Sequence, residues 1–451
     1  MNKQGNNKNL KNENLKLSFE SIENTLNSSE KETLRQDHSK SLQSNIALEQ
    51  SMAELRNYID VVGPCESINS NKINKILSFR PKNLPKKSKE EEEYHRRLVE
   101  ENRKIYLESI KQKQLKEQKI KEKEKLKKEK MNYYNNIWLN ELIPNWIEIR
   151  KKESTKFYFY EGLPNNLRGK IWLMCLGNRF SITKEYYEIE VKKAIDLLLE
   201  IQNKKKDQLK NINNKIEISK EEKEKNDREN SINIIDLDIE RTFPYLNIFT
   251  HNSPLSEDLR EILRAFVISR PDIGYVQGLS FIGAMLILNM DKFKAFVSMM
   301  NLILDPAILP FYKFDEKGIK TRLHLFKQIF YFNLPELCEY FDNLQINPEH
   351  YFLNWNMTLF SHCVNIDIAM RIWDVYMIEG LKSIYAAAIV FLSHFEQKFL
   401  NMDFSEILNQ INSIKLINFD EDSIIKGMKN VKFPDWVEIE IIKLNEETIP
   451  L

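Results

Sequence analysis

Glycine, proline and cysteine are scarce in this sequence. Its 451 residues include 11 glycines and 14 prolines, the two residue types that interrupt helices most strongly. Apolar residues make up 42% of the chain, and many recur at helical spacing, so we predict a mainly α-helical protein with a substantial core. The 4 cysteines are widely separated and form no C-x-x-C pair. This pattern is typical of reduced cytosolic thiols rather than of a disulfide framework.

Long hydrophobic runs and an excess of one charge are also lacking. The longest apolar run, residues 384–392, is too short to span a bilayer, and the polar first residues give no sign of a signal peptide. The 67 Lys and Arg residues nearly balance the 66 Asp and Glu residues, which argues against whole-molecule attraction to nucleic acid or to anionic membrane. We therefore expect a cytoplasmic protein that does not bind nucleic acid and whose membrane contact, if any, is peripheral.

Two charged segments come first. Residues 1–87 are rich in Asn, Lys, Ser and Glu, a composition too polar to form a core, so we expect a disordered tail. Residues 88–136 follow as a charged helix, which opens with Ser88 and Glu91 in capping-box spacing. The sparse apolar residues of this helix include Leu98, Ile105, Leu115, Ile120 and Leu126. They keep no regular heptad, which favours a solvated single helix over a coiled coil.

A core pattern begins near Trp138. We assign residues 137–430 to one helical domain, within which a break at residues 270–274 separates two strongly apolar helices. A Lys- and Glu-rich stretch, residues 203–230, interrupts the domain and is expected to be a loop insertion or an exposed helix extension. Residues 431–451 are assigned as a C-terminal tail.

The first motif with chemical meaning is I-x-x-D-x-x-R, formed by Ile235, Asp238 and Arg241. This spacing places the three side chains on one helical face. Pro244 follows closely, so Arg241 should lie at a helix end and project outward. In the simplest structural interpretation, Ile235 is a core residue and Asp238 pairs locally with Arg241, an ion pair of little energetic value.

The second motif is Y-x-Q-G, formed by Tyr275, Gln277 and Gly278 just after the proline-containing break. Gly278 would let another backbone approach closely, and Tyr275 is expected to pack and to make one hydrogen bond. Gln277 would lie where a helix begins, either as a buried amide that binds loop carbonyls or as an exposed group that orients water. An arginine and a glutamine presented together can complete the GTP hydrolysis of another protein.

Other patterns are expected to be structural. Residues 162–170 resemble a phosphate-binding loop, but the glycine spacing is too long and Ile171 stands where a Ser or Thr should hold Mg²⁺. The chain should therefore bind no nucleotide and need no cofactor of its own. Arg168, Gly169 and Trp172 form an R-G-x-x-W phrase, which is predicted to be a packing motif with a buried tryptophan.

The R-I-W-D phrase at residues 371–374 is also expected to be structural. Its simplest interpretation is an internal buried pair of Arg371 and Asp374, with Trp373 as an aromatic anchor. The 7 histidines show no pair at metal-ligand spacing, so no metal site is predicted.

Taken in order, these motifs resemble the TBC domain of Rab GTPase-activating proteins over roughly residues 140–420. The residues that carry the resemblance are Gly162, Leu163, Pro164, Arg168, Gly169, Trp172, Ile235, Asp238, Arg241, Tyr275, Gln277, Gly278, Trp355, Phe360, Arg371, Ile372, Trp373, Asp374 and Gly380. The phrases at residues 241–244 and 270–275 are similar to the branch that holds family members twelve and fourteen. Each phrase alone is modest, whereas the ordered set is specific.

The resemblance implies an all-α, V-shaped multi-helix domain that activates a GTPase in trans and is not itself an enzyme. Arg241 would be the arginine finger, and Gln277 would be a glutamine finger that replaces the glutamine of the Rab. The supporting residues would be Asp238, Ile235, Tyr275, Gly278, Arg168, Trp172, Arg371, Trp373 and Asp374. GTP and Mg²⁺ would be carried by the partner GTPase.

The expected partner is therefore a GTP-bound Rab-family small GTPase, and the expected process is vesicle trafficking. Two alternatives stay open: a catalytically silent TBC-fold scaffold or effector that binds GTP-loaded Rabs, and an unrelated helical interaction protein. The expected location is the cytoplasm, with peripheral association with endomembranes left open. The charged insertion and Val364-Asn365, where Leu-Pro is common, depart from the family pattern without touching either finger.

Overall fold

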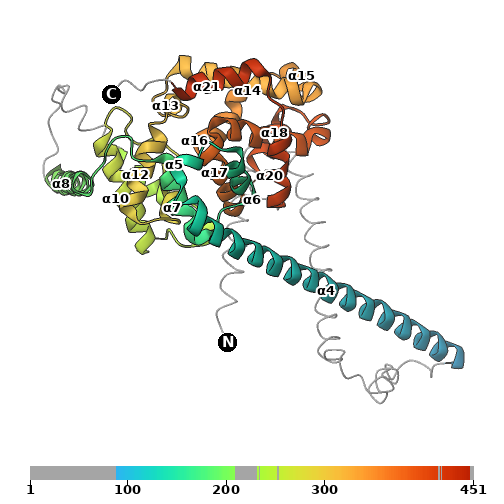
Figure 1. Cartoon of the computed structure of the whole chain (residues 1–451). Coiled ribbons are helices and arrows are strands. Elements are labelled where there is room, and N and C mark those ends of the chain that lie inside the picture. The colour runs from blue at the N-terminus through green and yellow to red at the C-terminus, as the bar shows by residue number, and fades with distance from the viewer. Residues whose placement is uncertain are drawn as a thin grey trace, which may run out of the picture. The chain divides into compact units, whose positions relative to one another are not determined.

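The protein is built from helices. The computed structural model describes residues 88–208, 231–232, 234–250, 253–414, 417 and 419–446. These residues form helices, turns and bends and contain no strand (Figure 1). The all-α class predicted from the sequence is therefore confirmed. The chain divides into two compact units, residues 1–119 and residues 120–451, and the expected disordered tail at residues 1–87 lies outside the described residues.

The helices with defined bounds follow in chain order. They are α4 (Lys89–Ile137), the π-helix η2 (Trp138–Leu142), α5 (Trp146–Ile149), α6 (Glu153–Glu161), α7 (Asn165–Leu176), α8 (Lys184–Gln208), the 3₁₀ helix η3 (Pro244–Leu246), α10 (Pro254–Ser269), α11 (Leu279–Ile287), α12 (Lys292–Ile303), α13 (Leu309–Tyr312), α14 (Glu316–Asn333), α15 (Pro335–Asn343), the 3₁₀ helix η4 (Pro348–His350), α16 (Phe352–Met357), α17 (Ile366–Glu379), α18 (Leu381–Phe399), α19 (Phe404–Asn412), α20 (Glu421–Asn430) and α21 (Asp435–Glu446). Residues 234–241 are also helical. We refer to them as the motif helix, because they carry the I-x-x-D-x-x-R motif.

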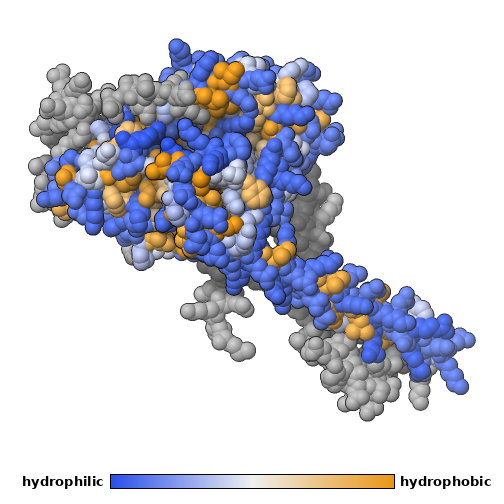
Figure 2. Space-filling model, in the orientation of Figure 1, coloured by the Kyte–Doolittle hydropathy of each residue, from blue (hydrophilic) through white to orange (hydrophobic). Residues whose placement is uncertain are grey.

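The charged helix α4 begins where the capping-box spacing predicts. The hydroxyl of Ser88 accepts a hydrogen bond from the backbone N–H of Glu91 at 3.1 Å, and acidic residues in the first turn complement the helix dipole. Only Tyr134, near its end, is buried. Figure 2 shows a largely hydrophilic surface along this helix, as expected for a solvated helix.

The core begins directly after α4. Trp138 is completely buried, and its ring lies 5.5 Å from that of Phe159 and 6.3 Å from that of Trp146. These aromatic contacts join η2, α5 and α6 within the second unit. The change from charged to aromatic composition therefore coincides with the end of α4 and the start of η2.

Helix α10 contacts the motif helix and also α11, which follows the second motif. Its N-cap Ser253 accepts from Ser256 N–H at 3.1 Å, and it packs against α8, α11 and α12 (Figure 1). Five apolar residues of this helix are completely buried: Leu259, Ile262, Leu263, Phe266 and Val267. Gly283 of α11 lets the two helices approach closely, because a Cβ there would lie 2.8 Å from Leu259 Cδ1.

The end of the chain differs from the sequence expectation. The sequence predicts a tail over residues 431–451, but α21 packs against α14. Its buried residues Val437, Ile441 and Leu444 have the i, i+4, i+7 spacing of an amphipathic helix. The insertion at 203–230 begins as a continuation of α8, and its residues 209–230 lie outside the described residues.

Among the described helices, none is long and apolar enough to cross a membrane.

Candidate functional site

The motif helix separates its three motif residues by exposure. Ile235 is completely buried, and the Asp238 side chain is 5% exposed, whereas that of Arg241 is 62% exposed. Arg241 Nη2 donates to Asp238 Oδ1. Arg241 is the last helical residue, so it projects outward as its position before Pro244 predicts, and it also makes the local ion pair.

The chain leaves the motif helix through an unusual backbone conformation. Phe243 has φ 45° and ψ 55°, a left-handed conformation that is rare for a bulky residue and unexpected before proline. Its buried ring packs edge-on against Phe281 at 5.2 Å. This packing helps to hold the strained residue in place, and its left-handed backbone does not allow the helix to continue.

A hydrogen bond joins the two sequence motifs. Tyr275 Oη donates to Asp238 Oδ2 at 2.9 Å, and the hydroxyl of Thr242 donates to that of Ser280 at 2.8 Å. Burial, together with the neighbouring Asp238 carboxylate, raises the pKa of Tyr275 well above its usual range, so the phenol remains a neutral donor. The buried carboxylate thus holds the segment that carries Gln277 beside the motif helix.

Gln277 is exposed. This placement rules out the buried-amide alternative for its side chain. The next residue, Gly278, has φ 101°, which is unfavourable for any residue with a side chain. A Cβ at Gly278 would also lie 3.1 Å from Thr358 Cγ2. Arg241 and Gln277 are therefore both accessible to a partner, on two segments that the Asp238 carboxylate connects.

Arg168, Trp172 and Asp374 form a buried cluster between α7 and α17. Arg168 Nε donates to Asp374 Oδ1 at 3.1 Å, and Trp172 Nε1 donates to the same oxygen at 2.9 Å. Asp374 and Trp172 are completely buried, and the Trp172 and Trp373 rings lie 5.2 Å apart. The cluster stabilises the packing of the two helices, which agrees with the packing role expected for Trp172.

The predicted pair of Arg371 and Asp374 is wrong. Asp374 pairs with Arg168, while Arg371 Nη2 donates to the carbonyl oxygen of Tyr160 at 2.8 Å. Gly162 makes this path possible, because a Cβ there would lie 1.7 Å from Arg371 Nη1. Arg371 therefore anchors the turn between α6 and α7 instead of pairing with Asp374.

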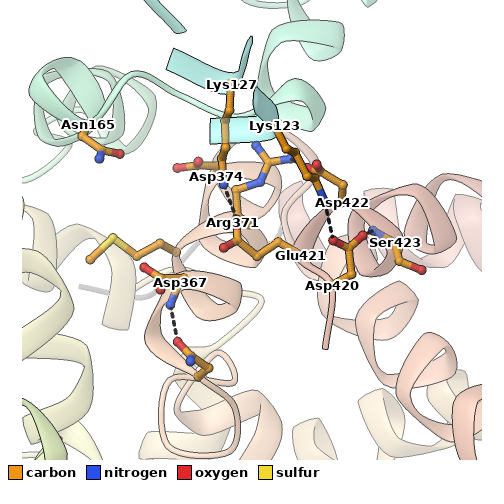
Figure 3. Close-up of polar contacts among 12 residues, drawn as sticks. Lys123, Lys127, Asn165, Asp367, Arg371, Asp374, Asp420, Glu421, Asp422 and Ser423 are labelled. Atoms are coloured by element: carbon orange, nitrogen blue, oxygen red, sulfur yellow. Dashed lines mark hydrogen bonds and ion pairs between the residues drawn. The ribbon is translucent and has the colours of Figure 1, made fainter. Parts of the chain in front are cut away.

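A cavity of about 950 Å³ lies between the end of α4, the α6–α7 turn, α17 and α20. Figure 3 shows that Lys123 and Lys127 bridge to α20, where they bind Asp420 at 3.2 Å and Glu421 at 3.0 Å. Neither Arg241 nor Gln277 lines it. Its cationic residues are balanced by nearby carboxylates, so we do not assign it as the functional site.

Comparison with known proteins decides the family. The Rab-GTPase-TBC domain matches residues 165–400, which is more than half of the chain. The chain belongs to the Rab-GTPase-TBC domain family. This range of the TBC domain includes both sequence motifs and the buried Arg168–Asp374 pair.

Three relatives support the assignment to the TBC family. TBC1 domain family member 12 of Mus musculus is 35% identical over 338 residues, which cover 74% of this chain and 46% of that protein. Member 14 of Homo sapiens is 34% identical over 335 residues, which cover 73% of this chain and 46% of that protein. Drainin of Dictyostelium discoideum is 32% identical over 400 residues, which cover 81% and 91%. The similarity to members twelve and fourteen confirms the predicted branch, although the matched residues span about half the length of these two relatives.

Sequence reasoning missed several residues that position the motifs of this TBC domain. Asp236 on the motif helix binds Arg260 and Arg264 of α10, and Thr242 binds Ser280. The i, i+4 spacing of the two arginines was the available signal, because it places both on one helix face. In the part of the chain that the structure describes, no group of three or more His, Cys, Asp or Glu side chains could hold a metal ion.

Proposed function

We propose that this protein is a GTPase-activating protein for Rab-family small GTPases, which would act on the GTP-loaded form and thereby regulate vesicle trafficking. The observation that supports it most strongly is the paired exposure of Arg241 and Gln277 on two segments that the Tyr275–Asp238 hydrogen bond connects. Membership in the Rab-GTPase-TBC family gives the partner class. The protein would not be an enzyme by itself, because the nucleotide and Mg²⁺ would arrive with the partner.

In this mechanism Arg241 inserts its guanidinium against the β- and γ-phosphates of the bound GTP. The planar group can donate to two phosphate oxygens while it neutralises developing charge. The arginine side of the ion pair with Asp238 is largely solvent-exposed, so water can solvate the guanidinium when the pair opens. Tyr275 would continue to bind Asp238, which limits the cost of leaving that carboxylate without the guanidinium.

Gln277 would orient the attacking water, in place of the glutamine of the Rab itself. Its exposure allows the carboxamide to reach into the active site of a partner. Arginine fingers contribute about 10³–10⁵ in rate, which corresponds to roughly 4–7 kcal/mol of transition-state stabilisation. Both groups would act by positioning and electrostatics, without a covalent intermediate.

Single-turnover phosphate release from a panel of purified, GTP-loaded Rabs tests this proposal. Acceleration of at least one Rab by the full chain supports it. Binding to a GTP-loaded Rab without acceleration anywhere in the panel would instead establish a catalytically silent scaffold or effector. If no Rab in the panel is bound or accelerated, both functions are contradicted. Because the response is measured without membranes, it also separates catalysis from any peripheral association with endomembranes.

A further inference from the structure

The motif helix has a second carboxylate that faces away from the Tyr275 contact. At about 100° per helical residue, Asp236 and Asp238 point in directions roughly 200° apart. Arg260 Nε donates to Asp236 Oδ1 at 2.8 Å. Arg264 Nη2 donates to Asp236 Oδ1 and Oδ2 at 3.0 and 3.1 Å. One carboxylate therefore receives two guanidinium groups from α10.

The two arginines are more deeply buried than the carboxylate that they bind. The Arg260 and Arg264 side chains are 10% and 17% exposed, whereas that of Asp236 is 45% exposed. Burial lowers the pKa of Arg264, and the Asp236 carboxylate opposes that effect. Hydrogen bonds between a guanidinium and a carboxylate are stronger than those between neutral groups, and the planar guanidinium restricts their geometry. The two arginines thus connect the motif helix to the buried face of α10.

Helix α10 also leads into the segment that carries Gln277. It ends at Ser269, and Arg270 then binds Asp272 at 2.7 and 2.6 Å in the turn that follows. Gln277 comes five residues after Asp272 in the sequence. Helix α10 therefore binds the motif helix through Arg260 and Arg264, and its C-terminal end leads directly into the segment that carries Gln277.

We propose that Asp236, Arg260 and Arg264 form a clamp that fixes the orientation of the helix carrying Arg241. The proposal rests on the proposed function, because it assigns these three as positioning residues for the same site. None of them needs to touch the partner or its nucleotide. Their effect is to keep Arg241 in the geometry for reaction, since a displacement of about 1 Å can cost as much as a hundredfold in rate.

Asp236→Asn tests the clamp, because it keeps the size of the side chain and removes its charge. With a responsive Rab, we expect kcat to fall about tenfold or more, while KM changes less than twofold. Asp342→Asn is the matched control, since it makes the same change in a 46% exposed carboxylate on α15 that binds Lys327 and no clamp residue, and the kcat of this variant should equal that of the wild type. Asp236→Glu should recover most of the lost rate. Wild-type kcat in Asp236→Asn would overturn the proposal.

Amide hydrogen exchange gives a readout that does not depend on any GTPase. Exchange of residues 234–241 should become about tenfold faster in Asp236→Asn and remain unchanged in Asp342→Asn. Unchanged exchange in Asp236→Asn would overturn the clamp. If Asp236→Asn fails to fold, Arg264→Lys replaces it, because an ammonium keeps the charge but cannot make the same planar contact. If the proposed function itself is wrong, the wild-type protein will accelerate no Rab. That outcome differs from a failure of the clamp alone, in which the wild type is active and Asp236→Asn is unchanged.

Discussion

The hydroxyl of Tyr275 donates a hydrogen bond to Oδ2 of Asp238, while Oδ1 of the same buried carboxylate accepts from Arg241. This single side chain therefore connects the helix that ends in Arg241 with the segment that continues to Gln277. The two motifs are separated in sequence by more than thirty residues, and the shared carboxylate brings them together. The Asp238 carboxylate depends on both hydrogen bonds, because a buried charge must satisfy its hydrogen bonds within the protein.

Tyr275→Phe should destabilise the protein by about 1.5–3 kcal/mol, the range for a hydrogen bond to a charged group. The ring would remain packed, so the loss reports the hydroxyl alone. Urea unfolding monitored by circular dichroism measures it as a lower midpoint at unchanged slope. Tyr331→Phe is the control, since Tyr331 is 52% exposed, and its midpoint should not move. Equal midpoints for the wild type and Tyr275→Phe would contradict the connecting role.

Asp374→Asn should cost about 3–5 kcal/mol of stability, because it leaves the buried Arg168 guanidinium without its counter-charge. The comparison is Glu316→Gln, which breaks an exposed ion pair with Lys320 and should leave the stability almost unchanged. Chemical denaturation of both variants gives the two values. A cost for Asp374→Asn as small as that of Glu316→Gln would show that the buried cluster does not stabilise the fold.

The turn before Gln277 should be sensitive to acid. Hydrogen bonding to Arg270, with Lys313 as a further partner, holds the pKa of Asp272 well below its usual range. A carboxyl whose folded pKa is depressed contributes stability above its unfolded pKa of about 3.9, and loses it as pH falls through the folded pKa. Asp272→Asn should therefore be less stable than the wild type at neutral pH, and the difference should shrink below about pH 4. A difference that does not depend on pH would contradict this assignment.

The sequence predicted the local features of the site and missed its long-range partners. The spacing of Ile235, Asp238 and Arg241 allows the local ion pair, and the proline after Arg241 correctly indicates that this arginine ends its helix and projects outward. The partner of Asp374 was assigned wrongly. Arg168 lies more than two hundred residues away in the chain, and proximity in sequence suggested Arg371 instead.

The same limit explains the support of the motif helix. In the sequence Asp236 is an ordinary polar residue of a helix. Only the fold shows that Arg260 and Arg264 of α10 bind it. Helix α21 was missed for another reason, since its apolar residues occupy two faces. Val437 and Ile441 are buried while Ile439 and Ile442 remain exposed, so its period is hard to recognise. Local chemistry was therefore predictable, whereas packing partners required the structure.

Gln277→Ala should lower the stimulated rate constant about 10²–10³-fold, the usual effect of removing one polar group that acts on the transition state. Folding should be unaffected, because the side chain is exposed. Stopped-flow phosphate release with a responsive Rab measures the rate, and thermal unfolding checks the fold. Gln118→Ala, at an exposed position of α4, should retain full activity. Full activity of Gln277→Ala would show that the Rab supplies its own glutamine.

Single-turnover hydrolysis of a responsive GTP-loaded Rab by wild type, Arg241→Ala and Arg241→Lys tests the central claim most directly. Both variants should fold normally, because the Arg241 side chain is 62% exposed. Arg241→Ala should lose about 10³–10⁵ of the stimulated rate, and Arg241→Lys should also fail, because an ammonium cannot donate to two phosphate oxygens in a planar fork. Wild-type stimulation by either variant would contradict the assignment of Arg241 as the arginine finger.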